Sequence, residues 1–162
     1  MKKLALFTLA IFTLSMLPTS AQTIAPNVQL RIAKAGGWAG MIYGSYDSYQ
    51  VSLKNKGTDT FYFINATCSY MKAFTTDNKN TGILDKHNCD KDVIMYYSIA
   101  PGGYYKYDVD VQPLPGCNDT TTFRLGFIWV KGVTGQNSFT NFHEQVQSDT
   151  CTIIWSKRVK FQ

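Results

Sequence analysis

The sequence has few of the residues that usually carry catalysis. Only two of its 162 residues are histidines, His87 and His143, and both lie in polar stretches where solvated side chains are common. The chain contains neither a G-x-S-x-G nor an H-E-x-x-H segment, the patterns that mark many hydrolases and zinc proteases. Asp108 and Asp110 share one face of an expected strand, but that face is the polar one. We therefore expect no enzymatic activity and no cofactor.

Metal-binding patterns are missing as well. The chain has no C-x₂-C pair, and the spacings of 21, 28 and 34 residues between the cysteines at positions 68, 89, 117 and 151 do not fit a zinc finger or ribbon. Asp85, Asp90 and Asp92 offer too few oxygen ligands for calcium, and Lys86 and Lys91 lie among them. The sequence thus predicts no metal site.

Charge is also sparse. Charged residues make up 17% of the chain, and the formal net charge is +5. Removal of a leader that contains Lys2 and Lys3 lowers this charge from +5 to +3, because two positive charges are lost. No basic run is longer than Lys157-Arg158, whereas a nucleic-acid surface needs clustered basic residues. We therefore expect no nucleic-acid partner.

One apolar run lies near the N-terminus. It extends from Leu4 to Leu17, follows two lysines, and ends at Pro18. A membrane span needs about 20 apolar residues, so this run is too short to be an anchor. The small residues Thr19-Ser20-Ala21 complete the pattern of a cleavable signal peptide over residues 1–21. We expect a secreted or periplasmic protein of one domain, residues 22–162, without a membrane span.

Alternation of apolar and polar residues dominates the expected mature chain and predicts β-strands. We expect seven strands, at residues 27–32, 49–54, 60–70, 93–99, 105–111, 123–130 and 152–161. Short strands separated by turns predict an all-β fold, a sandwich of two sheets. The alternation places Val109 and Trp155 in the core and Asp108 and Arg158 on the surface.

Two short segments resemble a known family. Residues 51–58 (VSLKNKGT) resemble the second strand and following turn of immunoglobulin-like accessory domains in bacterial surface and secreted proteins. Residues 99–103 (IAPGG) resemble the turn between the fourth and fifth strands of those domains. The resemblance implies an immunoglobulin-like two-sheet sandwich of about seven strands and no catalytic residues. Such domains serve binding, spacing or inhibition, and the fold alone does not choose among them.

The four cysteines are expected to form two disulfides, as is usual for an even number in an exported chain. In the immunoglobulin-like topology that the resemblance implies, Cys68 and Cys89 lie at the same end of the sandwich and can pair. Cys117 and Cys151 then pair by elimination, which requires the 131–150 segment to fold back along the domain. Two alternatives stay open: the last two strands are not simple neighbours, or Cys117 pairs with Cys68 or Cys89.

Aromatic residues outside the expected strands are candidates for ligand binding. Trp38, Tyr43 and Tyr46 lie in a glycine-rich segment that we interpret as a loop, where they either contact a ligand or cover the open end of the sandwich. Phe139 and Phe142 form a second group, in a long loop that follows residue 131.

The sequence therefore favours a binding module that recognises a protein or a glycan through its loops. The alternative is an inhibitor or immunity protein that blocks an enzyme by inserting a loop, with residues 131–150 as the candidate segment.

The leader gives a first testable prediction. Cleavage after Ala21 leaves Gln22 as the N-terminal residue of the exported protein, because small residues precede that bond. Intact-mass measurement of exported material checks this, and material that retains Met1 would contradict it.

Overall fold

The computed structural model describes residues 26–40, 44–86, 91–131, 139–149 and 151–161. Most of these residues lie in strands, so the all-β prediction is confirmed. The elements in chain order are β1 (Val28–Gly40), β2 (Gly44–Asn55), β3 (Phe61–Ala66), the 3₁₀ turn η1 (Tyr70–Ala73), β4 (Phe74–Thr76), β5 (Thr81–Ile83), β6 (Ile94–Ile99), β7 (Tyr104–Pro113), β8 (Thr122–Phe123), β9 (Leu125–Trp129), α1 (Phe139–Gln147), β10 (Thr152–Trp155) and β11 (Val159–Lys160).

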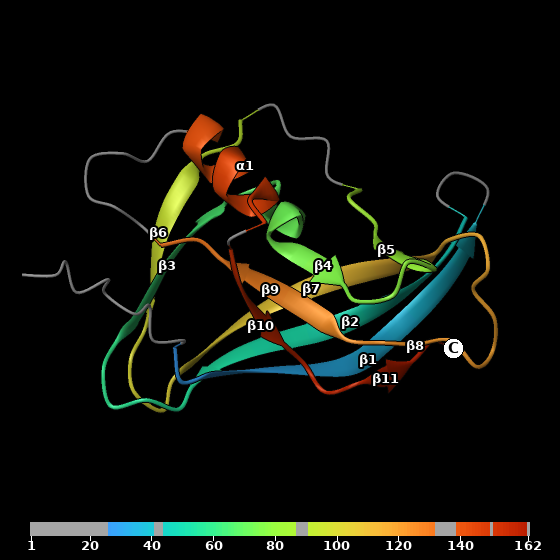
Figure 1. Ribbon diagram of the computed structural model, residues 1–162, viewed down its shortest axis with the longest axis horizontal. Coiled ribbons are helices and arrows are strands. Elements are labelled where there is room, and N and C mark those ends of the chain that lie inside the picture. Colours follow the sequence, from blue (N-terminus) through green and yellow to red (C-terminus); the bar gives the residue numbers. More distant parts are fainter. Residues whose placement is uncertain (1–25, 41–43, 87–90, 132–138, 150, 162) are drawn as a thin grey trace, which may run out of the picture.

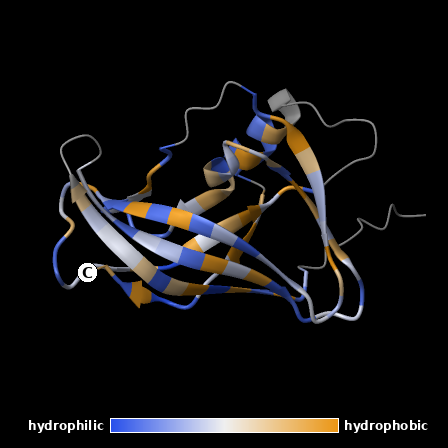
Figure 2. Ribbon diagram, turned by 180° about the vertical axis from the view of Figure 1, so that it is seen from behind, coloured by the Kyte–Doolittle hydropathy of each residue, from blue (hydrophilic) through white to orange (hydrophobic). Residues whose placement is uncertain are grey.

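The larger sheet has four antiparallel strands in the order β1-β2-β7-β5 (Figure 1). Val51 of β2 pairs with Tyr107 of β7, and Tyr49 pairs with Val109, and all four side chains are buried. The residues between them point to the opposite face, so hydrophilic and hydrophobic residues alternate along these strands (Figure 2). The alternation in the sequence therefore located the inner face of this sheet correctly.

One β-bulge interrupts the long β1–β2 hairpin. Lys34 pairs with Tyr49, but the next paired residue of β1 is Gly36, opposite Ser48. Ala35 is therefore the extra residue, and pairing then continues to Gly40 and Gly44. The glycine-rich segment that we interpreted as a loop is thus part of two paired strands.

The second layer contains the three-stranded sheet β10-β9-β4 and the short pair β11-β8 (Figure 1). The two pairs β9–β10 and β8–β11 are continuous along the chain, apart from irregular residues at 124 and 156–158. Backbone hydrogen bonds span the irregularity, from Ser156 N to Leu125 O (2.8 Å) and from Phe161 N to Thr121 O (2.9 Å). The single expected strands at 123–130 and 152–161 are therefore each divided in two.

Strands β3 and β6 form a separate antiparallel pair at one end of the molecule (Figure 1). Helix α1 packs on β3 and on η1, and its Phe142 is completely buried. A hydrogen bond from Ile64 N to Val130 O (3.0 Å) joins β3 to the chain just after β9. No helix in the described part of the chain is long and apolar enough to cross a membrane.

Aromatic rings from several strands meet in the core around Phe127 of β9. Its ring centroid lies 5.4 Å from that of Phe63 in β3 and 5.4 Å from that of Phe74 in β4. Tyr107 of β7 packs against Phe74 at 5.3 Å, and its hydroxyl accepts a hydrogen bond from Asn65 Nδ2 at 3.2 Å. These edge-to-face contacts connect both layers with the β3–β6 pair.

The face assignments are correct in β7 for Val109 and Asp108 but fail in the last strand. Arg158 is exposed as expected, whereas Trp155 is only half-buried and Ser156 is buried. The strand becomes irregular after Trp155, where the Ser156 Oγ accepts from Leu125 N at 3.0 Å and donates to Lys157 O at 2.7 Å. The inner face of β10 is thus the one that carries Ile154 and Ser156, one residue out of step with the prediction, while Ile153 and Trp155 pack over Gly126 on the other face.

The predicted Cys117–Cys151 disulfide is wrong, because both cysteines are free. Cys151 precedes β10, whose first residue pairs with Trp129 at the end of β9, whereas Cys117 precedes Thr122 at the start of β8. The two thiols thus lie at opposite ends of a strand segment about 23 Å long, and bridged Cα atoms lie within about 7 Å. Cys89 lies outside the described residues, so the Cys68–Cys89 pair stays a prediction.

Gly126 generates a stability prediction for the second layer. A Cβ atom at this position in β9 would lie 2.6 Å from Ile153 Cγ2 and 2.8 Å from Trp155 Cζ3. Gly126→Ala should therefore lower the free energy of unfolding by about 1–3 kcal/mol, the usual cost of overpacking. Gly36→Ala is the matched control in a strand, because no atom lies within 4 Å of its Cβ position. Urea unfolding of both variants checks this, and equal stability would contradict it.

Candidate functional site

The β1–β2 hairpin extends past the rest of its sheet. The ladder between β2 and β7 ends at Asp47 and Val111, but β1 and β2 stay paired as far as Gly40 and Gly44. Residues 37–40 and 44–46 therefore form a two-stranded projection, which we call the hairpin tip (Figure 1). Glycine fits here for a local reason, because a Cβ atom on Gly37 would lie 2.9 Å from Asp47 Oδ1.

Two of the predicted binding residues lie together in the hairpin tip. Trp38 pairs directly with Tyr46, so the two rings lie on the same face of the ribbon. Trp38 is 63% exposed, and Tyr46 is partly exposed. Both line a shallow groove of about 360 Å³, together with Ser45 and Phe161. Tyr43 lies outside the described residues.

An ion pair fixes Tyr46 from the side of β5. Lys86 Nζ lies 4.0 Å from the centroid of the Tyr46 ring and 2.6 Å from Asp110 Oδ2. Burial lowers the pKa of Lys86, but hydrogen bonds to Asp110 and Tyr46 outweigh this effect and raise the pKa above its ordinary value. Ser48 Oγ donates a hydrogen bond to Asp110 Oδ1 on the same face. These contacts explain why Asp110 is buried, although the alternation placed it on the polar face.

A second buried carboxylate lies on the other face of β2, at the base of the hairpin tip. Asp47 is 3% exposed, and its Oδ1 lies 2.8 Å from Lys34 Nζ. Its Oδ2 accepts a hydrogen bond from the Tyr49 hydroxyl at 3.2 Å. Burial, followed by the charge of Asp47, raises the pKa of Tyr49 well above its ordinary value, so the hydroxyl stays a donor. The base of the hairpin tip is thus held on both faces.

The second predicted aromatic group does not join the first. Phe142 is buried in the core on α1, and α1 lies well away from the hairpin tip (Figure 1). Phe139 begins the same helix, and its side chain lies outside the described residues. The prediction of a binding loop there is wrong for Phe142, because a helical turn directs this ring inward. A short helix with few charged residues gave too weak a signal to be recognised.

A larger groove at the opposite end of β1 and β2 was missed. It has a volume of about 660 Å³, and its walls include Tyr62, Trp129 and Lys131. Tyr62 is 63% exposed, and Trp129 Nε1 donates to the Tyr62 carbonyl oxygen at 3.0 Å. Lys131 Nζ lies over the Trp129 ring, 4.7 Å from its centroid, and covers one face of that ring. Tyr62 and Trp129 lie within the expected strands 60–70 and 123–130, and only aromatic residues outside the expected strands were binding candidates.

His143 contacts a lysine side chain. His143 Nε2 lies 3.4 Å from Lys72 Nζ, and burial together with the Lys72 charge lowers the pKa of His143 below its ordinary value. The ring is therefore neutral at pH 7. His87 lies outside the described residues. Within the described ranges, no group of three or more His, Cys, Asp or Glu side chains is placed to hold a metal ion.

Comparison with protein-family models, curated proteins and solved structures finds no match to this chain. Its function must therefore be inferred from its own geometry. Among the described residues, the hairpin tip combines an exposed aromatic pair with a rigid base.

The Lys86–Asp110 ion pair can be tested by removing one partner. Lys86→Met leaves a carboxylate that is only 10% exposed without its ammonium partner. We expect a loss of about 1–2 kcal/mol in the free energy of unfolding, less than for a fully buried pair because Lys86 is 24% exposed. Lys106→Met removes the same charge from an exposed position on β7 and should change stability by less than about 0.5 kcal/mol. Equal losses of stability for the two variants in urea unfolding would show that the Lys86–Asp110 ion pair does not stabilise the fold.

Proposed function

We propose that this chain is a secreted or periplasmic, non-enzymatic binding module that recognises a protein or glycan ligand through the hairpin tip. The observation that carries the proposal is the exposure of Trp38, at 63%, directly opposite Tyr46 on a ribbon that extends past its sheet. An exposed indole of this kind gains about 25 cal/mol for each Å² of apolar surface that a ligand covers.

The rigidity of the site supports binding. Aromatic rings offer a large contact area with few rotatable bonds, so little conformational entropy is lost when a ligand covers them. The contact with Lys86 already restricts the Tyr46 ring, and the strand pairing fixes the backbone at Trp38. A ligand therefore meets a surface whose geometry is set before binding, which favours affinity.

We also propose that the domain is an immunoglobulin-like sandwich. The two segments that suggested this resemblance, residues 51–58 and 99–103, lie side by side. Asn55 N donates to Gly103 O at 3.0 Å, and Gly102 N donates to Asn55 O at 3.0 Å. The Asn55 side chain is buried and donates to Ile99 O at 2.8 Å. One side chain thus joins the two turns, which supports the resemblance that the two segments carry.

The projection of the hairpin also favours a second candidate function. An inhibitor or immunity protein blocks an enzyme by placing a rigid segment in its cleft. The segment suggested by the sequence, 131–150, contains α1, which packs on the body of the domain. The hairpin tip replaces it as the inserting element, because it is paired only with itself beyond Asp47.

Substitution of Trp38 tests the function. Wild type, Trp38→Ala and Tyr104→Ala are immobilised, exposed to fluid from the producing culture and to a glycan array, and compared for retained ligand. Tyr104 is a matched control, since it is 62% exposed but does not line the tip groove. Trp38→Ala should weaken ligand retention about tenfold or more, as expected for an aromatic hot spot. The melting temperature should change by less than about 3 °C, because an exposed ring adds little to stability.

Two outcomes would contradict the proposal. Equal ligand retention by wild type and Trp38→Ala would exclude Trp38 from the binding surface. A large fall in melting temperature with unchanged retention would instead show that Trp38 covers the core.

A further inference from the structure

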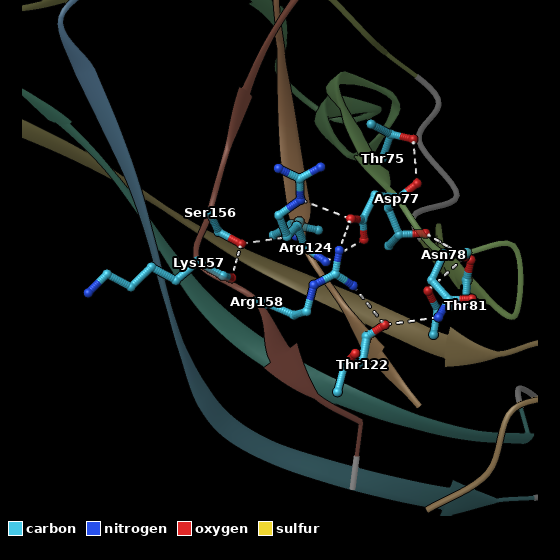
Figure 3. Close-up of polar contacts among 11 residues, drawn as sticks. Thr75, Asp77, Asn78, Thr81, Thr122, Arg124, Ser156, Lys157 and Arg158 are labelled. Atoms are coloured by element: carbon cyan, nitrogen blue, oxygen red, sulfur yellow. Dashed lines mark hydrogen bonds and ion pairs between the residues drawn. The ribbon is translucent and has the colours of Figure 1, made fainter. Parts of the chain in front are cut away.

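Two arginines share one carboxylate on the second layer (Figure 3). Asp77 follows β4, Arg124 lies between β8 and β9, and Arg158 lies between β10 and β11. Arg124 Nε is 2.9 Å from Asp77 Oδ2, and Arg158 Nη2 is 2.7 Å from the same oxygen. The backbone N of Arg124 also donates to Asp77 Oδ1 at 2.6 Å. Three segments that are distant in the sequence therefore meet at one side chain.

The charges at this point do not balance. Burial raises the pKa of Asp77, but hydrogen bonds from Arg124 and the charges of both arginines outweigh it and hold the pKa below its ordinary value. Asp77 is therefore ionised at neutral pH, and both guanidinium groups are always charged. One carboxylate faces two guanidinium groups, which leaves one positive charge uncompensated among the described contacts.

Most hydrogen-bond donors of the two arginines are unused. A guanidinium group has five N–H donors, and Arg124 directs only its Nε toward Asp77. Its four terminal N–H groups have no acceptor among the described residues. Arg158 reaches Asp77 through Nη2 and the Thr122 carbonyl oxygen through Nη1, the latter at 3.4 Å. The two side chains are 41% and 53% exposed, so the remaining donors face solvent.

The orientation of Arg124 is fixed from a second side. Its guanidinium carbon lies 5.0 Å from the centroid of the Trp155 ring, within the range of a cation–π contact. Trp155 itself packs across Gly126, where no side chain intervenes. Asp77 and Trp155 together hold the guanidinium plane, so an incoming ligand has little side-chain freedom to remove.

We propose that Arg124 and Arg158 form an oxyanion-binding site that takes the carboxylate, sulfate or phosphate group of a ligand. Paired guanidinium groups match the oxygen geometry of these anions and bind them through charge-assisted hydrogen bonds. A shallow groove of about 570 Å³ along β4 and β5 begins at Asp77, the residue that both arginines contact, and its lining includes Lys79 but neither arginine. The site shares no residue with the hairpin tip, so either proposal can fail without the other.

Anion titration tests the site. The mature protein is titrated with sodium acetate, sulfate or phosphate at constant ionic strength, and the arginine Nε and Trp155 indole resonances are followed by NMR. Wild type should show saturable shifts at Arg124 and Arg158. Arg124→Lys and Arg158→Lys keep the charge but lose the paired donors, and each should raise the apparent Kd about tenfold. The anion with the lowest apparent Kd identifies the ligand group as a carboxylate, a sulfate ester or a phosphate ester.

Lys157→Gln is the matched control, because it removes a charge next to Arg158 from a side chain that points away from the two arginines (Figure 3). Its apparent Kd should stay within about twofold of wild type, since it loses no donor of the site. Absence of saturable shifts in wild type would overturn the proposal, as would equal weakening in Lys157→Gln and the arginine variants. If Arg124→Lys unfolds, Arg158→Lys provides the same comparison, because it leaves the contacts of Arg124 intact.

Discussion

The packing of aromatic rings around Phe127 is the interaction on which the rest of the structure depends. Backbone ladders hold each sheet together, but the layers meet through side chains. Phe127 contacts Phe63 and Phe74. Phe74 in turn packs against Tyr107 of the four-stranded sheet. Because interiors are packed as densely as organic crystals, these rings fix the distance and angle between the layers. The position of β7, and hence the point at which the hairpin loses its neighbour, follows from this packing.

The sequence predicts regular strands well and irregular ones poorly. Alternation placed Val51, Val109 and Val111 in the core, because β2 and β7 are regular and have one polar face. It failed at Trp155, because β10 turns Ile154 inward instead, and at Asp110, whose burial depends on its ion pair with the distant Lys86. It also missed β4 and β5, since each is only three residues long and too short to show a period.

The two candidate sites differ in the same way: the residues of one are close together in the sequence, whereas those of the other are brought together only by the fold. Composition alone indicated Trp38 and Tyr46, since glycine and aromatic residues are concentrated there, but their direct pairing required the register of two strands. The arginine site gave no sequence signal, because Asp77, Arg124 and Arg158 are 47 and 34 residues apart along the chain. Charges that are isolated in sequence are brought together only by the order β10-β9-β4.

The β-bulge at Ala35 decides which side of the hairpin displays its indole. If Ala35 were instead paired with Ser48 in an uninterrupted ladder, Trp38 would stand opposite Ser45 and share a face with Asp47, because side chains alternate with a period of two. With the bulge, Trp38 stands opposite Tyr46 and shares the face of Lys86. A slip of one residue in this pairing would therefore turn the aromatic ring to the other side of the ribbon while leaving every residue of the tip unchanged. The side of the ribbon on which Trp38 stands is therefore set by the place where the pairing of β1 with β2 is interrupted.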